Sequence, residues 1–179
     1  MRKVPSFIYA VALMAVSLNT TFAQSKPQAL SKEVRHELLM LPDYNVFDWL
    51  EFEIKDEDTV VLRGQVIRPI TKSDAEARVE RIKGVEKVVN EIEVLPPSNF
   101  DNRLRRQIYH ALFNWNSPLF HYGTQPVPSI HIIVQHGQVT LKGLVARKAD
   151  SQFAYLKANS VSGSFGVKNE LQIEQDLKQ

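Results

Sequence analysis

The chain contains one motif twice, and this repeat limits its fold more than any other feature. Residues 60–66 read Val-Val-Leu-Arg-Gly-Gln-Val, and residues 139–145 read Val-Thr-Leu-Lys-Gly-Leu-Val. The two motifs are displaced by 79 positions, and so are the paired residues that follow. These pairs are Gly64 with Gly143, Gly84 with Gly163, and Asn90 with Asn169. A constant displacement across a strand, a helix and a second strand indicates two copies of one small module.

Hydrophobic periodicity predicts the same element order, α-β-β-α-β, in both copies. For the first copy we expect helices over 30–40 and 71–83 and strands over 49–55, 59–67 and 85–95. For the second we expect helices over 101–114 and 147–161 and strands over 129–135, 138–145 and 165–174. The predicted fold class is α+β, with a three-stranded mixed sheet in each copy and two helices packed on one face. The mid-strand glycines, Gly64 and Gly143, predict a bulge or a close approach of a helix to the backbone.

The copies define the domain boundaries. The first domain is expected over 30–95 and the second over 101–175, with a short, stiff linker at 96–100 that contains Pro96 and Pro97. The first helices of the two copies align at a displacement of 74 rather than 79. The second copy therefore has about five more residues before its first strand, in a loop over 115–128 that is rich in proline, glycine and aromatic residues.

The first 23 residues have the pattern of a secretory signal peptide. Arg2 and Lys3 precede a mostly apolar run over 8–18, and Thr21 and Ala23 are the small residues before a predicted cleavage between Ala23 and Gln24. The apolar run is shorter than the roughly 20 residues that a membrane-spanning helix needs. We therefore expect a periplasmic or secreted protein that is soluble after cleavage and has no transmembrane segment in the mature chain.

Charge is divided unevenly between the copies. The chain has 22 Lys and Arg against 20 Asp and Glu. Residues 27–97 carry 10 basic and 15 acidic side chains, whereas residues 98–179 carry 9 basic and 5 acidic ones. The near-neutral whole lacks the charge of a nucleic-acid-binding protein, and the asymmetry indicates either a charged partner or attraction between the two halves.

The repeated sequence motifs resemble those of the BON domain, a small module of bacterial periplasmic and outer-membrane-associated proteins. The motifs of the first copy are Val60-x-Leu62-x-Gly64-x-Val66, Ala75, Ala77 and Gly84-Val85-x-x-Val88-Val89-Asn90. Those of the second are Val139-x-Leu141-x-Gly143-x-Val145, Ala154, Ala158, Val161, Gly163 and Val167-x-Asn169, with a departure at Phe165. The layout is similar to that of osmotically induced periplasmic proteins. The resemblance implies phospholipid binding and envelope maintenance under osmotic stress, and it supplies no catalytic residues.

The sequence favours no catalytic or metal site. It has no cysteine, so thiol chemistry and thiolate metal ligands are excluded. The five histidines, at 36, 110, 121, 131 and 136, lack metal-ligand spacing and are expected to face solvent or a polar rim. Ser129, His131 and Asp150 form no recognisable triad because no nucleophile elbow surrounds a serine. We therefore expect no enzyme, cofactor or metal.

The remaining candidate is a binding surface on the second copy, where basic residues accompany more aromatic and aliphatic residues than one buried helix face needs. Such a surface suits an anionic phospholipid membrane. The candidate residues are Arg147, Lys148, Phe153, Tyr155, Lys157, Trp115, Phe120 and Tyr122. The acidic helix of the first copy, with Asp74, Glu76 and Glu80, would be repelled by that membrane.

Two alternatives to lipid binding remain open at this stage. One is a protein–protein adaptor for an envelope protein, in which the acidic copy meets the basic copy of a neighbouring molecule and association weakens with salt. The other is binding of envelope glycan, with Trp115, Tyr122 and Asn116 as the contacts.

Overall fold

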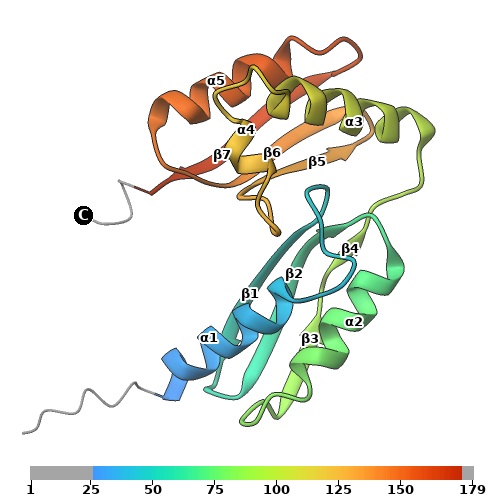
Figure 1. Ribbon diagram of the computed structural model, residues 1–179. Helices are drawn as coiled ribbons and strands as arrows, with labels where there is room; N and C mark the ends of the chain where they lie inside the picture. Colours follow the sequence, from blue (N-terminus) through green and yellow to red (C-terminus); the bar gives the residue numbers. More distant parts are fainter. Residues whose placement is uncertain (1–25, 175–179) are drawn as a thin grey trace, which may run out of the picture.

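The computed structural model describes residues 26–174, so the predicted signal peptide lies outside the described residues. The chain forms two α/β domains in succession, as the repeat predicts (Figure 1). The first domain contains α1 (Lys26–Leu39), β1 (Trp49–Lys55), β2 (Thr59–Val66), α2 (Pro69–Val79), β3 (Lys87–Asn90) and β4 (Glu93–Val94). The second contains α3 (Asn99–Phe113), α4 (Phe120–Gly123), β5 (Ile130–Gln135), β6 (Gln138–Val145), α5 (Lys148–Asn159) and β7 (Gly166–Ile173).

The sheet of the first domain is mixed, as predicted. β1 pairs antiparallel with β2, and β2 pairs parallel with β3 and β4. Alternation in β1 and β2 places apolar residues on the face that α1 and α2 cover, and these residues form one core with both helices. The predicted final strand is interrupted, because Glu91 and Ile92 lie between β3 and β4 and Ile92 enters the core with 1% of its surface exposed.

The second domain repeats this arrangement with an uninterrupted last strand. β6 is central, antiparallel to β5 and parallel to β7. α3 and α5 cover one face of the sheet, and Leu104, Ile108 and Leu141 are buried between them and the strands. The predicted insertion over 115–128 contains the short helix α4, which packs beside α3. Among the described residues, no helix is long and apolar enough to cross a membrane.

The two mid-strand glycines are required by the neighbouring strand rather than by a helix. Gly64 and Gly143 have φ values of +126° and +117°, which residues with a side chain rarely adopt. A Cβ atom at Gly64 would lie 1.9 Å from the backbone oxygen of Trp49, and one at Gly143 would lie 2.0 Å from that of Ser129. The predicted close approach of a helix is therefore wrong, because the crowding atom belongs to the first residue of β1 at Gly64 and to the residue before β5 at Gly143.

The paired asparagines join β3 to α2 in the first domain and β7 to α5 in the second. The side-chain amide of Asn169 donates to the hydroxyl of Ser151 at 2.9 Å, and its oxygen accepts from the backbone amide of Leu171 at 3.2 Å. Asn90 bonds in the same way to the carbonyl of Lys72 and to the amide of Ile92. Each asparagine therefore holds a strand and a helix together.

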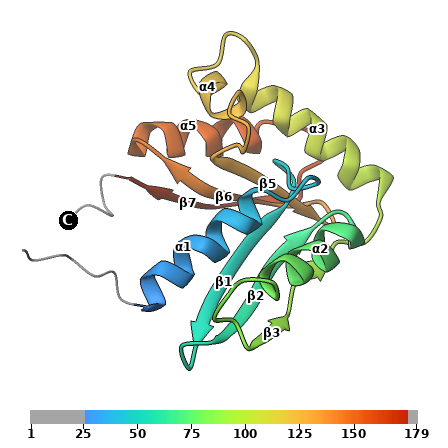
Figure 2. The same cartoon turned by 60° about the horizontal axis from the view of Figure 1, so that its bottom comes forward.

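The domains are in direct contact through the loop that precedes β1. In Figures 1 and 2 the sheet of the second domain has its helices on one side and the first domain on the other. The backbone oxygen of Val46 accepts a hydrogen bond of 2.8 Å from the amide of Ile132 in β5. Val46 is 7% exposed and packs, together with Phe47, into the core of the second domain.

His131 is buried at this contact, so the expectation that all five histidines face solvent or a polar rim is wrong at this position. Its side chain projects from the outer face of β5 and is 4% exposed. The imidazole stacks on Tyr44 and meets Trp49 edge-on, with ring centroids 5.3 Å and 5.2 Å away. The other four histidines are exposed.

Candidate binding surfaces

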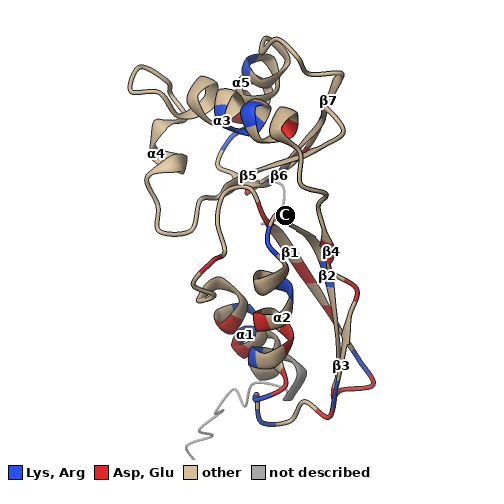
Figure 3. Cartoon of the chain, turned by 90° about the vertical axis from the view of Figure 1, so that its right-hand side faces the viewer, with Lys and Arg blue, Asp and Glu red and all other residues tan. Residues whose placement is uncertain are grey.

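The helix layer of the second domain carries exposed cations and no exposed carboxylate. The two acidic residues of α3 and α5, Asp101 and Asp150, are both buried. The exposed charged side chains of these helices are Arg103, Arg106, Lys148 and Lys157. Figure 3 shows the blue segments on α3 and α5, whereas red segments are frequent on α1 and α2. The helix layer of the second domain is therefore the cationic end of the molecule.

Large apolar side chains are exposed beside these cations. Trp115, directly after α3, has 82% of its surface exposed and meets Phe120 edge-on at 5.2 Å. On α5, Leu156 is 64% exposed and Tyr155 is 37% exposed. Phe165, before β7, is 71% exposed and stacks on Phe100 at 5.8 Å. Isolated exposed apolar residues are ordinary, but several around one cationic layer indicate a contact surface.

Some residues that the sequence singled out have structural roles in the fold. Tyr122 is 5% exposed, and its hydroxyl donates to Asp150 at 3.0 Å and accepts from the amide of Ala146 at 2.9 Å. Burial raises the pKa of this phenol, and the Ala146 amide opposes that rise. Phe153 is half-buried against the core, and Arg147 forms an ion pair with Asp150 at 3.2 Å.

The remaining candidates keep their polar or apolar ends accessible. The ammonium of Lys157 lies 5.4 Å from the ring centroid of Phe153 and forms no ion pair among the described residues. Lys148 begins α5 and is exposed. The structure thus leaves Lys148, Tyr155 and Lys157 on one accessible helix and places Trp115 at the edge of the same layer.

The structure also contains a groove, of about 1050 Å³, between the two domains. α1 and β1 of the first domain form one wall, to which Leu38, Leu50 and Phe52 contribute. The outer faces of β5, β6 and β7 form the other wall, where His131 and Lys142 contribute. Residues from both domains are needed to form this groove, which we call the interdomain groove.

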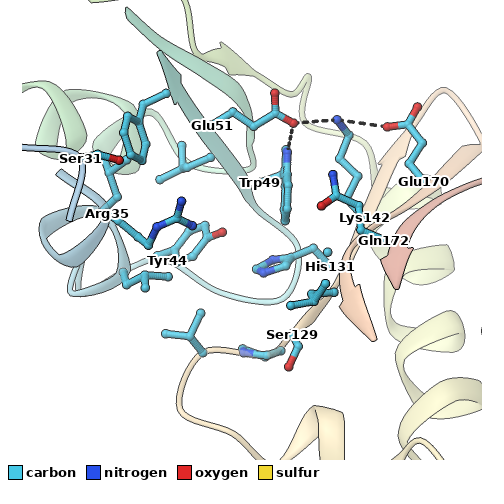
Figure 4. Close-up of a pocket in the computed structure, with 18 of the residues that line it drawn as sticks. Ser31, Arg35, Tyr44, Trp49, Glu51, Ser129, His131, Lys142, Glu170 and Gln172 are labelled. Atoms are coloured by element: carbon cyan, nitrogen blue, oxygen red, sulfur yellow. Dashed lines mark hydrogen bonds and ion pairs between the residues drawn. The ribbon is translucent and has the colours of Figure 1, made fainter. Parts of the chain in front are cut away.

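Lys142 connects the domains at one side of the interdomain groove. Its ammonium lies 3.3 Å from Glu51 on β1 and 3.2 Å from Glu170 on β7, and it lies over the ring of Trp49 at 5.7 Å (Figure 4). Hydrogen bonds from Lys168 and from Lys142 hold the pKa of Glu170 below its ordinary value. These charges are therefore compensated within the protein.

Two buried ionisable groups lie at the base of this contact. Burial lowers the pKa of His131 to about 4, so its imidazole is neutral near pH 7. Burial raises the pKa of Asp48, whose carboxylate accepts hydrogen bonds from the amides of Ile67 and Asn45 at 2.8 Å and 3.1 Å. Arg105 in α3 contributes an opposing electrostatic effect on Asp48 from the second domain.

Comparison with known protein families decides the relationship of this chain. A family profile described as BON domain matches residues 29–96 and again residues 101–175. The chain belongs to the BON domain family. The two matches fall on the two copies that the repeat of 79 positions defines. The family assignment supports a non-catalytic, envelope-associated binding module.

Comparison with individual proteins adds less. No curated protein matches the chain. One similar solved structure is the C-terminal domain of CdsD, the structural protein of the type III secretion system of Chlamydia trachomatis, with 12% identity and a TM-score of 0.31 over 80% of this chain and 96% of that chain. A second CdsD structure gives 15% identity and a TM-score of 0.31 over 84% and 96%.

The interdomain groove of this tandem BON protein was missed by the sequence analysis. Leu50, Phe52 and Ile54 alternate with charged residues in β1, and this alternation predicts only a strand over 49–55. Nothing in that alternation shows that the second domain lies beside the strand. The one available signal was the rigid two-proline linker, which restricts how far the BON domains can separate.

Proposed function

We propose that the protein binds the surface of anionic phospholipid membranes through the helix layer of its second BON domain, as a non-catalytic module for envelope maintenance under osmotic stress. The observation that carries this proposal is the composition of the exposed layer. Every exposed charge of α3 and α5 is basic, and Leu156 and Trp115 project there with 64% and 82% of their surface exposed. Apolar side chains would enter the headgroup region while the cations face anionic lipid.

The expected energy is sufficient for peripheral binding and insufficient for permanent insertion. A basic residue near an anionic membrane contributes about 1 kcal/mol, so Arg103, Arg106, Lys148 and Lys157 provide about 4 kcal/mol together. Burial of an exposed leucine in the membrane adds about 2 kcal/mol. Binding should therefore be reversible and should weaken with salt.

The first BON domain has a different surface. Its helices α1 and α2 carry exposed Glu33 and partly exposed Asp74 and Glu76, and exposed Glu80 caps α2; α1 also carries the exposed cations Lys32 and Arg35. An anionic membrane would repel these carboxylates, so we assign membrane contact to the second domain alone.

Co-sedimentation with vesicles tests the proposal. Protein should pellet with phosphatidylglycerol vesicles at low salt, should pellet less at high salt, and should remain in solution with pure phosphatidylcholine. Leu156→Glu together with Lys157→Glu should abolish pelleting. Ile70→Glu is the matched control, because Ile70 is a large apolar residue on α2 of the first domain and is 49% exposed. Pelleting that is equal with neutral and anionic vesicles, or that is lost in the control variant, would contradict the proposal.

A further inference from the structure

The outer edge of the second sheet is closed by the protein itself. β5 is the edge strand, and its alternate backbone groups point away from β6. The outward amide of Ile132 donates to the carbonyl of Val46, and the carbonyl of Val134 accepts from the guanidinium of Arg105. The segment around Val46 thus adds to β5 in the manner of a short additional strand.

The equivalent edge of the first sheet is open. Phe52 lies opposite Leu62 as Ile132 lies opposite Leu141, and the two leucines are related by the displacement of 79. The amide of Leu50, which precedes Phe52 by two residues, is directed to the hydroxyl of Tyr44. The outward amides and carbonyls of the next two alternate residues, Phe52 and Ile54, have no hydrogen-bond partner among residues 26–174. Such an edge is a template for another extended segment.

The open edge lies within the interdomain groove. Phe52 and Ile54 line the groove with their side chains, and Leu38 of α1 faces them. His131 closes the inner wall and is 4% exposed. An occupant would therefore meet apolar side chains and unpaired backbone groups.

Charges are separated along this edge. Arg35 of α1 places its guanidinium 5.8 Å from the ring centroid of Phe52, and no carboxylate among the described residues pairs with it. Asp56 and Glu57 form the turn after β1, are exposed, and make no ion pair within residues 26–174. The edge thus has an uncompensated cation beside its middle and uncompensated anions at its far end.

We propose that the interdomain groove binds an extended peptide segment of a partner protein, which adds to β1 as an antiparallel strand. The segment carries apolar residues at alternate positions, a positive charge at its start beside Asp56 and Glu57, and a carboxylate at its end beside Arg35. Main-chain hydrogen bonds to Phe52 and Ile54 provide affinity, and the groove selects the apolar side chains. This site is separate from the proposed membrane surface.

The unpaired backbone groups favour a peptide over other occupants. A lipid chain would fill the apolar wall but would leave the amides and carbonyls of Phe52 and Ile54 without partners. A second copy of the protein is disfavoured by charge, because symmetric antiparallel pairing of two β1 strands about Phe52 would place Glu51 of each copy opposite Glu53 of the other.

Amide hydrogen exchange followed by NMR tests the open edge directly. In the free protein the amides of Phe52 and Ile54 should exchange quickly, whereas that of Ile132, bonded to Val46, should exchange slowly. Slow exchange at Phe52 and Ile54 in the free protein would overturn the proposal, because the edge would already be paired.

The binding experiment adds a mixture of seven-residue peptides with free termini, of pattern Lys-Thr-x-Thr-x-Thr-x, where x is Val, Leu, Ile or Phe. The peptides should protect the amides of Phe52 and Ile54 from exchange, and N-methylation of the first two x residues should abolish that protection. If no protection appears at millimolar peptide, the proposal is wrong. If lysophosphatidylglycerol shifts the Trp49 signals without protecting these amides, the occupant is a lipid and the peptide proposal is overturned.

Charge variants separate this site from the membrane surface. Arg35→Glu should weaken binding of the peptide with a free carboxylate by about tenfold. It should leave the binding of a carboxamide-terminated peptide almost unchanged. Lys32→Glu is the matched control, because Lys32 is exposed on the same helix and lies outside the groove lining. Leu156→Glu should reduce vesicle binding and leave peptide binding unchanged. Equal losses of peptide affinity in Arg35→Glu and Lys32→Glu would contradict the proposed direction of the peptide, with its carboxylate beside Arg35.

Discussion

The amide of Ile132 donates to the carbonyl of Val46 across 2.8 Å, and this bond joins the edge of the second sheet to a loop of the first domain. Val46 and Phe47 also pack into the core of the second domain. The second core is therefore completed by residues from outside its own sequence repeat. The two BON domains should consequently unfold as coupled units rather than independently.

The coupling can be tested at Phe47, whose ring meets Tyr109 edge-on at 6.2 Å. Phe47→Ala should lower the free energy of unfolding of the second domain by about 2 kcal/mol, although the substitution lies in the first. Urea denaturation of the whole protein, with probes in each domain, measures this effect. Ile70→Ala is the control, because Ile70 is 49% exposed and should cost less than about 0.5 kcal/mol. An equal effect of both substitutions would argue against the coupling.

His131 should make stability depend on pH. Burial lowers its pKa from 6.5 to about 4, so between these values the unfolded chain binds more protons than the folded protein. The contribution of His131 to the free energy of unfolding is therefore fully present above pH 6.5. It should fall by up to about 3 kcal/mol as the pH decreases to 4. The raised pKa of Asp48 acts in the opposite direction, because its protonation on acidification favours the folded state.

Urea denaturation between pH 7 and pH 4 separates the histidine contribution. His131→Phe retains an aromatic ring and should remove most of the loss of stability over this range. His36→Phe, at an exposed position on α1, should retain it. An unchanged pH profile in His131→Phe would show that another group dominates.

Two glycine substitutions should differ in severity. Both Gly143 and Gly84 have positive φ, of +117° and +98°, so alanine at either position introduces backbone strain of about 1 kcal/mol. Gly143→Ala also brings a Cβ atom within 2.0 Å of the oxygen of Ser129, whereas no atom lies within 4 Å of a Cβ at Gly84. We expect Gly143→Ala to prevent stable folding of the second domain and Gly84→Ala to be tolerated, as measured by circular dichroism during thermal unfolding. Similar melting temperatures would contradict this explanation.

Asn169 in β7 and Asn90 in β3 should contribute similarly to the stability of their domains. Asn169→Ala removes the bonds to Ser151 and to the amide of Leu171, and should cost about 1–3 kcal/mol because the partner groups lose their bonds. Asn90→Ala should have a similar cost. Asn159→Ala, at an exposed position without a side-chain hydrogen bond among those described, is the control and should change stability by less than about 0.5 kcal/mol.

The repeated architecture was predictable because it depends on local periodicity. Alternation identified β1 and β2, and the displacement of 79 identified the equivalent glycines and asparagines. The interruption between β3 and β4 was not predicted, because Glu91-Ile92 continues an apolar pattern and only the burial of Ile92 in the core reveals the break.

The candidate surfaces were less predictable because burial depends on contacts distant in sequence. Tyr122 and Trp115 occur in one aromatic loop, yet the bond from Tyr122 to Asp150 draws only the tyrosine inward. His131 had no sequence signal for burial, because the residues that cover it, Tyr44 and Trp49, belong to the other domain. The same distance in sequence explains why the interdomain groove was missed.

The hydrogen bond between Val46 and Ile132 makes the two copies of the module non-equivalent. The loop before β1 serves as the donor of an extra strand, and the edge of β5 is its acceptor, so the two copies perform different tasks despite their common pattern. A gene in which their order was exchanged would encode the same residues but would separate donor from acceptor. We expect such a permuted protein to expose β5 and to self-associate, so the present order of the copies is itself under physical constraint.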